Sequence, residues 1–131
     1  MKRSRGSPDR FDDPDRVADA IIAHVGKNIV LALPLGLGKA NHVANALFAR
    51  ASADPSIRLH IFTALTLETP RSRPGLERRF LQPFAQRVLA GYPELAYAKA
   101  LHACTLPANI IVDEFFFQAG TILGIAAAHD G

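Results

Sequence analysis

Segments with the hydrophobic pattern of strands alternate along this chain with segments that have the pattern of amphipathic helices. Three stretches are predicted to be strands, at 28–33, 58–68 and 110–117. The first is almost continuously apolar, which predicts a strand buried on both faces. Strands that alternate with helices are typical of parallel sheets with right-handed crossovers. We therefore predict an α/β fold, an open and mostly parallel sheet with flanking helices.

Apolar residues at helical spacing predict the four helices of this fold. The clearest stripe lies in 40–51, where apolar side chains recur at steps of three and one, as on a helix that packs against a sheet. Asp13 and Pro14 suit the start of the first helix, and Gly26 suits its end. Pro83 is expected to kink or split the third helix. The helices are expected at 14–26, 40–54, 76–91 and 94–104.

Composition narrows the class of protein. With 131 residues, 49% hydrophobic and 21% charged, and a net charge of +3, the chain is too apolar to be disordered. The single cysteine, Cys104, excludes a disulfide scaffold and is expected to be a packed thiol. No apolar stretch reaches the roughly 18–20 residues of a membrane span, and no signal-peptide core follows the basic N-terminus. We expect a cytoplasmic protein with no membrane partner.

The pattern of basic residues and histidines predicts neither a nucleic-acid site nor a metal site. Basic residues cluster near the N-terminus and again in 71–87, without the aromatic stacking positions of a nucleic-acid module, so no nucleic-acid partner is expected. The five histidines lack the spacing of a zinc site, and no metal is expected. Residues 1–12 are predicted to be a disordered basic leader, and residues 13–131 a single α/β domain.

A glycine-rich turn joins the first predicted strand to the clearest predicted helix. Gly36 and Gly38 let the backbone approach a ligand, and the helix start offers free N–H groups to an anion. Lys39 adds a charge, and Asn41 is a candidate helix cap. The spacing matches neither the P-loop nor the dinucleotide fingerprint. The turn is therefore a ligand site without a standard nucleotide signature, or a tight β–α turn that needs glycine for its dihedral angles.

Four segments in order resemble the N-terminal region of the acetyl-CoA hydrolase/transferase family, which belongs with the class I CoA-transferases. The glycine-rich turn is the first segment, and the others fall on the second strand, the third helix and the third strand. The resemblance extends over roughly residues 15–125. The segments are LPLGLGKANH at 33–42, IFTALTLE at 61–68, LERRFLQPF at 76–84 and EFFFQAG at 114–120.

The resemblance implies a partial CoA-transferase-like domain, the N-terminal half of a longer two-part enzyme. In that family a glutamate of the second half attacks an acyl-CoA thioester, and CoA passes to a carboxylate acceptor or water resolves the intermediate. That glutamate would lie outside this chain, so we expect no catalytic residue here and no activity from the chain alone. Acyl-CoA would be a substrate rather than a bound cofactor. The resemblance places Gly36, Leu37 and Gly38 at the thioester and Gln118 and Gly120 at the cleft. Lys39 would either contact a CoA phosphate or cap the helix region, and Asn41 is a further candidate ligand contact.

Alternative interpretations remain open at this stage. The chain is alternatively a stand-alone module that binds CoA or another phosphate ligand at the turn, or a non-catalytic subunit that pairs with a separate second half or with its own copy. A strand containing Phe115–Phe117 would place one face in the core and the other in such an interface. Glu114 is disfavoured as a catalytic group, because Asp113 beside it would point to the opposite face of the strand.

Overall fold

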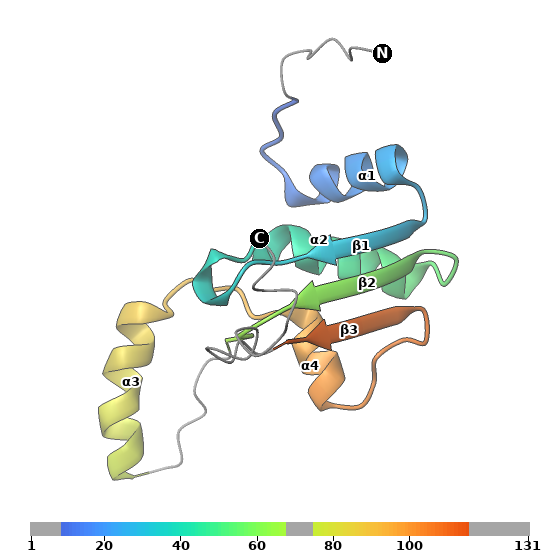
Figure 1. Ribbon diagram of the computed structural model, residues 1–131. Coiled ribbons are helices and arrows are strands. Elements are labelled where there is room, and N and C mark those ends of the chain that lie inside the picture. Colours follow the sequence, from blue (N-terminus) through green and yellow to red (C-terminus); the bar gives the residue numbers. More distant parts are fainter. Residues whose placement is uncertain (1–8, 68–74, 116–131) are drawn as a thin grey trace, which may run out of the picture.

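Three parallel strands form the centre of the molecule. The structure, a computed structural model, describes residues 9–67 and 75–115. Within these residues the strands β1 (Asn28–Ala32), β2 (Arg58–Thr63) and β3 (Ile110–Glu114) form one parallel sheet in the order β1-β2-β3 (Figure 1). Leu59 of β2 lies opposite Ile29 on one side and Ile110 on the other. The predicted α/β fold with an open parallel sheet is confirmed.

The described helices lie mainly on one side of this sheet. Figure 1 shows α2 and α4 behind the strands, α1 beside α2 near β1, and α3 extending away from the sheet. A short 3-10 helix, η1, sits in the turn between β1 and α2. The bounds are α1 (Pro14–Val25), η1 (Gly36–Gly38), α2 (Asn41–Ala53), α3 (Leu76–Val88) and α4 (Ala96–His102).

Helix α1 has the ends that its sequence predicts. The Asp13 side chain accepts a hydrogen bond from the N–H of Asp15 at 2.9 Å, and Pro14 occupies the first helical position. Gly26 ends the helix with φ at +88°, and its N–H donates to the Ile22 carbonyl at 2.9 Å. The capping signals therefore locate both ends correctly.

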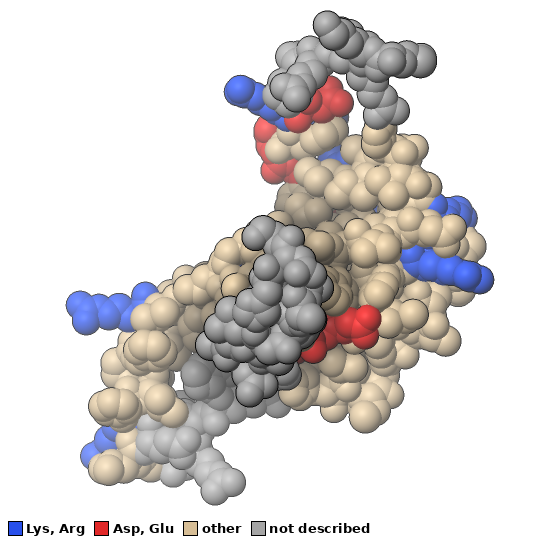
Figure 2. All heavy atoms as spheres, viewed as in Figure 1, with Lys and Arg blue, Asp and Glu red and all other residues tan. Residues whose placement is uncertain are grey.

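One arginine of α2 forms ion pairs with helix α1. Arg50 of α2 donates from Nε to Asp19 and from Nη1 to Asp15, both at 2.9 Å. The hydrogen bond from Arg50 lowers the pKa of Asp19. In Figure 2 acidic atoms gather near α1. The pair of helices is thus joined by charge at its exposed rim.

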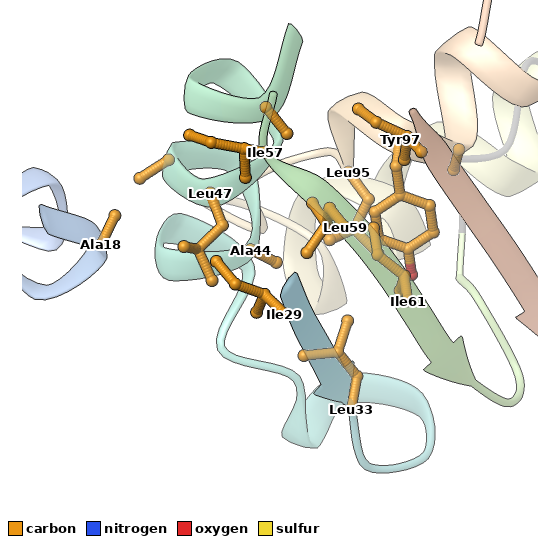
Figure 3. Packing of buried hydrophobic residues seen from close by; sticks show 14 residues of the cluster. Ala18, Ile29, Leu33, Ala44, Leu47, Ile57, Leu59, Ile61, Leu95 and Tyr97 are labelled. Atoms are coloured by element: carbon orange, nitrogen blue, oxygen red, sulfur yellow. The ribbon is translucent and has the colours of Figure 1, made fainter. Parts of the chain in front are cut away.

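The hydrophobic core lies between α2 and the sheet. Leu47 of α2 packs in one cluster with Ile29 of β1 and with Leu59 and Ile61 of β2 (Figure 3). Tyr97 of α4 closes the same cluster and is almost fully buried. The small buried residues Ala44, Ala46 and Ala51 of α2 let the helix approach the strands closely.

The opposite face of the sheet is exposed within the described residues, so the prediction that β1 is covered on both faces is wrong. Val30 of β1 is 72% exposed and Ile111 of β3 is 56% exposed. Phe62 lies on this face between β1 and β3 and stacks on Phe115, with ring centroids 4.8 Å apart. Only alternate residues of the apolar run are buried, because the side chains between them point away from α2 and α4.

Two strand ends differ from the prediction, and one helix does not break. Strand β2 stops at Thr63 rather than at 68, because Leu65 adopts a left-handed backbone with φ at +48°. Strand β3 ends at Glu114. The predicted strand residues 116 and 117 lie outside the described residues. Helix α3 continues through Pro83 instead of splitting there.

Cys104 is exposed, which corrects the expectation of a packed thiol. The residue follows the end of α4 and has a left-handed backbone with φ at +55°. Its N–H donates to the Leu101 carbonyl at 3.1 Å, as in a helix-terminating turn. This turn directs residue 104 outward, whereas the prediction had continued the helix to that position.

One asparagine links the amino-terminal ends of β2 and β3 to α2 by hydrogen bonds. Asn109, just before β3, donates from Nδ2 to the carbonyls of Ala51 and Ile57, both at 2.8 Å. These carbonyls belong to the last turns of α2 and to the approach to β2. A single amide therefore joins the helix and two neighbouring strands.

We predict that Asn109→Asp destabilises the fold by about 2 kcal/mol or more. A carboxylate cannot donate hydrogen bonds to the two carbonyls, and its oxygens would be repelled by the carbonyl oxygens. Urea denaturation of the purified variant measures this change. Asn28→Asp, at an exposed position, is the matched control and should stay within about 0.5 kcal/mol of the wild type. Equal losses in both variants would contradict the role given to Asn109.

Candidate functional site

The turn between β1 and α2 lies at the carboxyl edge of the parallel sheet. Leu33 continues from β1, with its N–H donating to the Phe62 carbonyl at 2.9 Å. The chain then forms η1 and enters α2 at Asn41. Ligands of open α/β sheets bind outside this edge. The glycine-rich turn therefore lies where the fold usually places a ligand.

The two glycines of the turn have different roles. Gly36 has a left-handed backbone with φ at +55°, and an added Cβ would meet only Leu67 Cδ1 at 3.9 Å. Gly38 has no positive φ, and an added Cβ would lie in ordinary contact with Pro34. The N–H of Gly38 donates weakly to the Leu35 carbonyl at 3.3 Å. Backbone conformation thus requires glycine at Gly36 and not at Gly38.

Lys39 is committed to the protein rather than exposed toward a ligand. The residue is only 7% exposed, and Nζ donates to the carbonyl of Ala64 at 2.6 Å and to that of Leu65 at 3.1 Å. Burial lowers the pKa of Lys39, and the nearby Glu114 carboxylate partly opposes this shift. Lys39 fastens the turn to the end of β2, beside the left-handed Leu65.

Asn41 does not cap α2, contrary to the prediction. The N-cap position belongs to Ala40, which has no side-chain capping bond, and Asn41 is the first helical residue. Asn41 is 3% exposed, and its Nδ2 donates to the Pro93 carbonyl at 2.7 Å. The helix therefore begins one residue earlier than a cap at Asn41 would imply.

Asn45, one helical turn further on, binds the same neighbouring segment. Its Nδ2 donates to the Glu94 carbonyl at 2.9 Å, and its Oδ1 accepts from the N–H of Ala96 at 2.8 Å. Together with Asn41 it holds the chain that leads into α4 against α2. The i, i+4 spacing of two asparagines on α2 is a signal in the sequence from which this contact could have been predicted.

A cavity of about 500 Å³ opens at the N-terminus of α2. Its walls are the end of the glycine-rich turn, the first turn of α2, and the segment that follows α3. Two of its lining residues carry buried polar atoms without a hydrogen-bond partner, Asn41 Oδ1 and the hydroxyl of Tyr92. The remaining lining residues are Leu37, Lys39, Ala40, His42, Val43, Val88, Ala90, Gly91 and Pro93.

A second polar group lies at the carboxyl ends of β2 and β3. Glu114 Oε1 accepts from the N–H of Thr66 at 2.7 Å, and the Tyr97 hydroxyl lies 3.4 Å from Thr66 Oγ1. Burial is the main cause of the raised pKa of Tyr97. Asp113 instead pairs with His60 at 2.7 Å, so the two neighbouring carboxylates have separate partners, as strand alternation predicts.

Three further expectations concern the ligand contacts beyond β3, metal binding and membrane spans. Gln118 and Gly120, the other expected ligand contacts, lie outside the described residues. Among residues 9–67 and 75–115, no cluster of three histidine, cysteine or acidic side chains has the arrangement of a metal site. No helix in this part of the chain has the length and apolar character needed to cross a membrane.

Comparison of the chain with family models, curated proteins and solved structures gives no match. The likeness to acetyl-CoA hydrolases and transferases therefore rests on the four sequence segments alone.

We predict that Gly36→Ala destabilises the fold by about 1–2 kcal/mol, because alanine is strained in the left-handed region. Gly38→Ala, two residues away in the same turn, should change stability by less than about 0.5 kcal/mol. Urea denaturation of the two variants side by side measures the difference. A loss at Gly38 as large as that at Gly36 would show that close packing, rather than backbone conformation, selects glycine in this turn.

Proposed function

We propose that this chain is the acyl-CoA-binding part of an acetyl-CoA hydrolase or acetate CoA-transferase, and that the nucleophilic glutamate comes from a second half. The observation that carries the proposal is the cavity at the N-terminus of α2, which adjoins the glycine-rich turn at the carboxyl edge of the sheet. This position supports ligand binding in open α/β folds, and the sequence of the turn supports acyl-CoA as the ligand.

In this proposal the thioester lies beside Gly36–Gly38 and the start of α2. The cap residue Ala40 offers no side chain to the first N–H groups of α2. N–H groups at a helix start stabilise negative charge that develops on a carbonyl oxygen. The turn would thus assist an attack on the thioester without supplying the nucleophile.

The carboxylate of Glu114, which lies near Lys39, is already engaged. Glu114 accepts from the Thr66 N–H and lies close enough to Lys39 to influence its pKa. A nucleophilic carboxylate must instead be directed at the thioester carbon. The proposal therefore leaves the chemical step to a group outside the described residues.

Binding of a phosphate ligand at the turn is a weaker alternative. Such a site would use Lys39 as its cation, yet Lys39 Nζ donates hydrogen bonds to two carbonyls at the end of β2. Breaking them would expose a strained turn at Leu65. The geometry favours a ligand that approaches the cavity without displacing Lys39.

A non-catalytic subunit is a second candidate, favoured by the exposed sheet face. Val30, Phe62 and Ile111 present apolar side chains there, and parallel strands are normally covered on both faces. A second polypeptide that presents an apolar surface would complete the fold. The flanking genomic sequence tests this role. An adjacent reading frame that encodes the other α/β half is expected, and its absence would contradict pairing with a separate second half.

We predict that CoA and acetyl-CoA raise the melting temperature of the purified chain at millimolar concentration, because ligand that binds only the folded state stabilises it. Ala90→Trp, which fills the cavity, should abolish the shift. Ala49→Trp, at an exposed position of α2 outside the cavity, should keep it. No thioester hydrolysis is expected from the chain alone.

A missing shift with the wild-type chain would overturn the proposed function. Persistence of the shift in Ala90→Trp would place CoA elsewhere on the molecule. Thioester hydrolysis that is lost in Glu114→Gln would contradict the assignment of the nucleophile to a second half.

A further inference from the structure

Helix α3 has an apolar stripe that the rest of the described chain leaves exposed. The stripe consists of residues four apart in sequence, Leu76, Phe80, Phe84 and Val88. Leu76 is 85% exposed and Phe80 is 80% exposed, and the other two are about half exposed. Within the described residues, none of the four belongs to the core cluster or packs against it. Helix α3 therefore presents to solvent the kind of surface that helices of globular proteins normally bury.

The position of α3 keeps this stripe away from the core. In Figure 1 the helix extends away from the sheet, whereas α2 and α4 lie behind the strands. The half-buried side chains of α3 are Leu81 and Ala85, which lie on a neighbouring side of the helix. The partial burial of α3 thus uses a different side, and the stripe is left for another surface.

The sequence of α3 is basic. Its 13 residues contain three arginines and one glutamate, so the helix carries two of the three net positive charges of the whole chain. Arg79 and Arg87 are exposed and have no ion pair or hydrogen bond within the described residues. Figure 2 shows basic atoms over α3. An apolar stripe beside unpaired positive charge is complementary to an anionic surface.

The same charge disfavours a second copy of this chain as the occupant. Two α3 helices packed against each other would bring like charges together, which costs binding energy. The exposed sheet face carries Arg58, and its Asp113 carboxylate is already paired with His60. Among residues 9–67 and 75–115, that face therefore offers no unpaired carboxylate to the arginines of α3.

The pattern of α3 is typical of a helix that lies on a membrane. Residues four apart turn by about 40° around the helix, so the stripe covers roughly a third of its circumference. Six of the 13 residues are charged or carry side-chain amides, and the apolar side contains leucine and phenylalanine. Helices with one apolar side, basic residues and low average hydrophobicity bind in the plane of the membrane interface.

We propose that α3 binds the surface of an anionic lipid bilayer. Leu76, Phe80 and Phe84 would enter the boundary of the acyl chains, and Arg79 and Arg87 would extend to the anionic headgroups. A helix about 20 Å long would lie along the surface and not cross it. Such a helix needs neither the membrane span nor the signal peptide whose absence led us to expect no membrane partner. The inference is independent of the proposed acyl-CoA function.

Co-sedimentation of the full chain with lipid vesicles tests the inference. Vesicles of phosphatidylcholine with about 30% phosphatidylserine should bind the chain, and pure phosphatidylcholine vesicles should bind it at least about tenfold more weakly. Added salt should weaken binding to the anionic vesicles, because it screens the arginine charges. Phe80→Ser should weaken binding about tenfold or more, since the phenylalanine no longer enters the bilayer. The variant should fold normally because Phe80 is largely exposed, and circular dichroism checks this.

Matched controls change exposed side chains of the same kinds outside α3. Val30→Ser and Arg58→Gln lie on the sheet face and should bind the anionic vesicles as the wild type does. Arg87→Gln, by contrast, should weaken binding about fivefold, the effect of one basic residue near an anionic surface.

The inference is overturned if the wild-type chain does not bind the anionic vesicles or binds the neutral vesicles equally well. It is also overturned if Phe80→Ser and Val30→Ser bind alike, because binding would then belong to another part of the chain, such as its basic N-terminus. A wild-type dimer in analytical ultracentrifugation that Phe80→Ser converts to a monomer would assign the stripe to a second copy and refute the membrane site.

Discussion

Helix α2 lies across the β1–β2 pair, and the position of almost every other described element follows from that contact. Leu47 fills the space above Ile29 and Leu59, and the alanines beside it let the helix backbone approach the sheet. Parallel strands place their carboxyl ends at one edge. Packing α2 on this pair therefore brings its N-terminus to the same edge, where the glycine-rich turn and the cavity are found.

Polar side chains then fix the irregular segments around this core. Lys39 binds the end of β2, Asn45 binds the segment before α4, and Asn109 joins α2 to the start of the sheet. Each of these donors reaches carbonyls that lack a place in helix or sheet ladders, and so removes the cost of burying them. Asn41 is the exception, since half of its amide is left unpaired.

Much of the fold was predictable because it depends on local rules. The Asp13, Pro14 and Gly26 signals located both ends of α1, and alternation of strands and helices identified the parallel sheet. The errors arose where distant residues decide the outcome. Leu65 turns the chain and ends β2 early, at a place where its carbonyl and that of Ala64 accept from Lys39.

The candidate site was predictable in its position and not in its chemistry. The glycines and Lys39 indicated the turn that the cavity adjoins, but only the tertiary structure shows that Lys39 donates to two carbonyls. Tyr92 is distant from the turn in sequence, and nothing local to it signals a cavity. Its contribution depends on the contact between Asn41 and Pro93, which joins segments 52 residues apart.

The strand order β1-β2-β3 also constrains how the sheet can assemble. Each strand pairs with its neighbour in sequence, so no strand has to be inserted between two others already paired. The β1–α2–β2 unit closes a shorter stretch of chain than the β2–β3 connection, which contains α3 and α4. The entropic cost of loop closure is therefore smaller for the β1–α2–β2 unit. This unit also contains the Leu47 contacts. Assembly in chain order, with β3 added last, is the route that this topology favours.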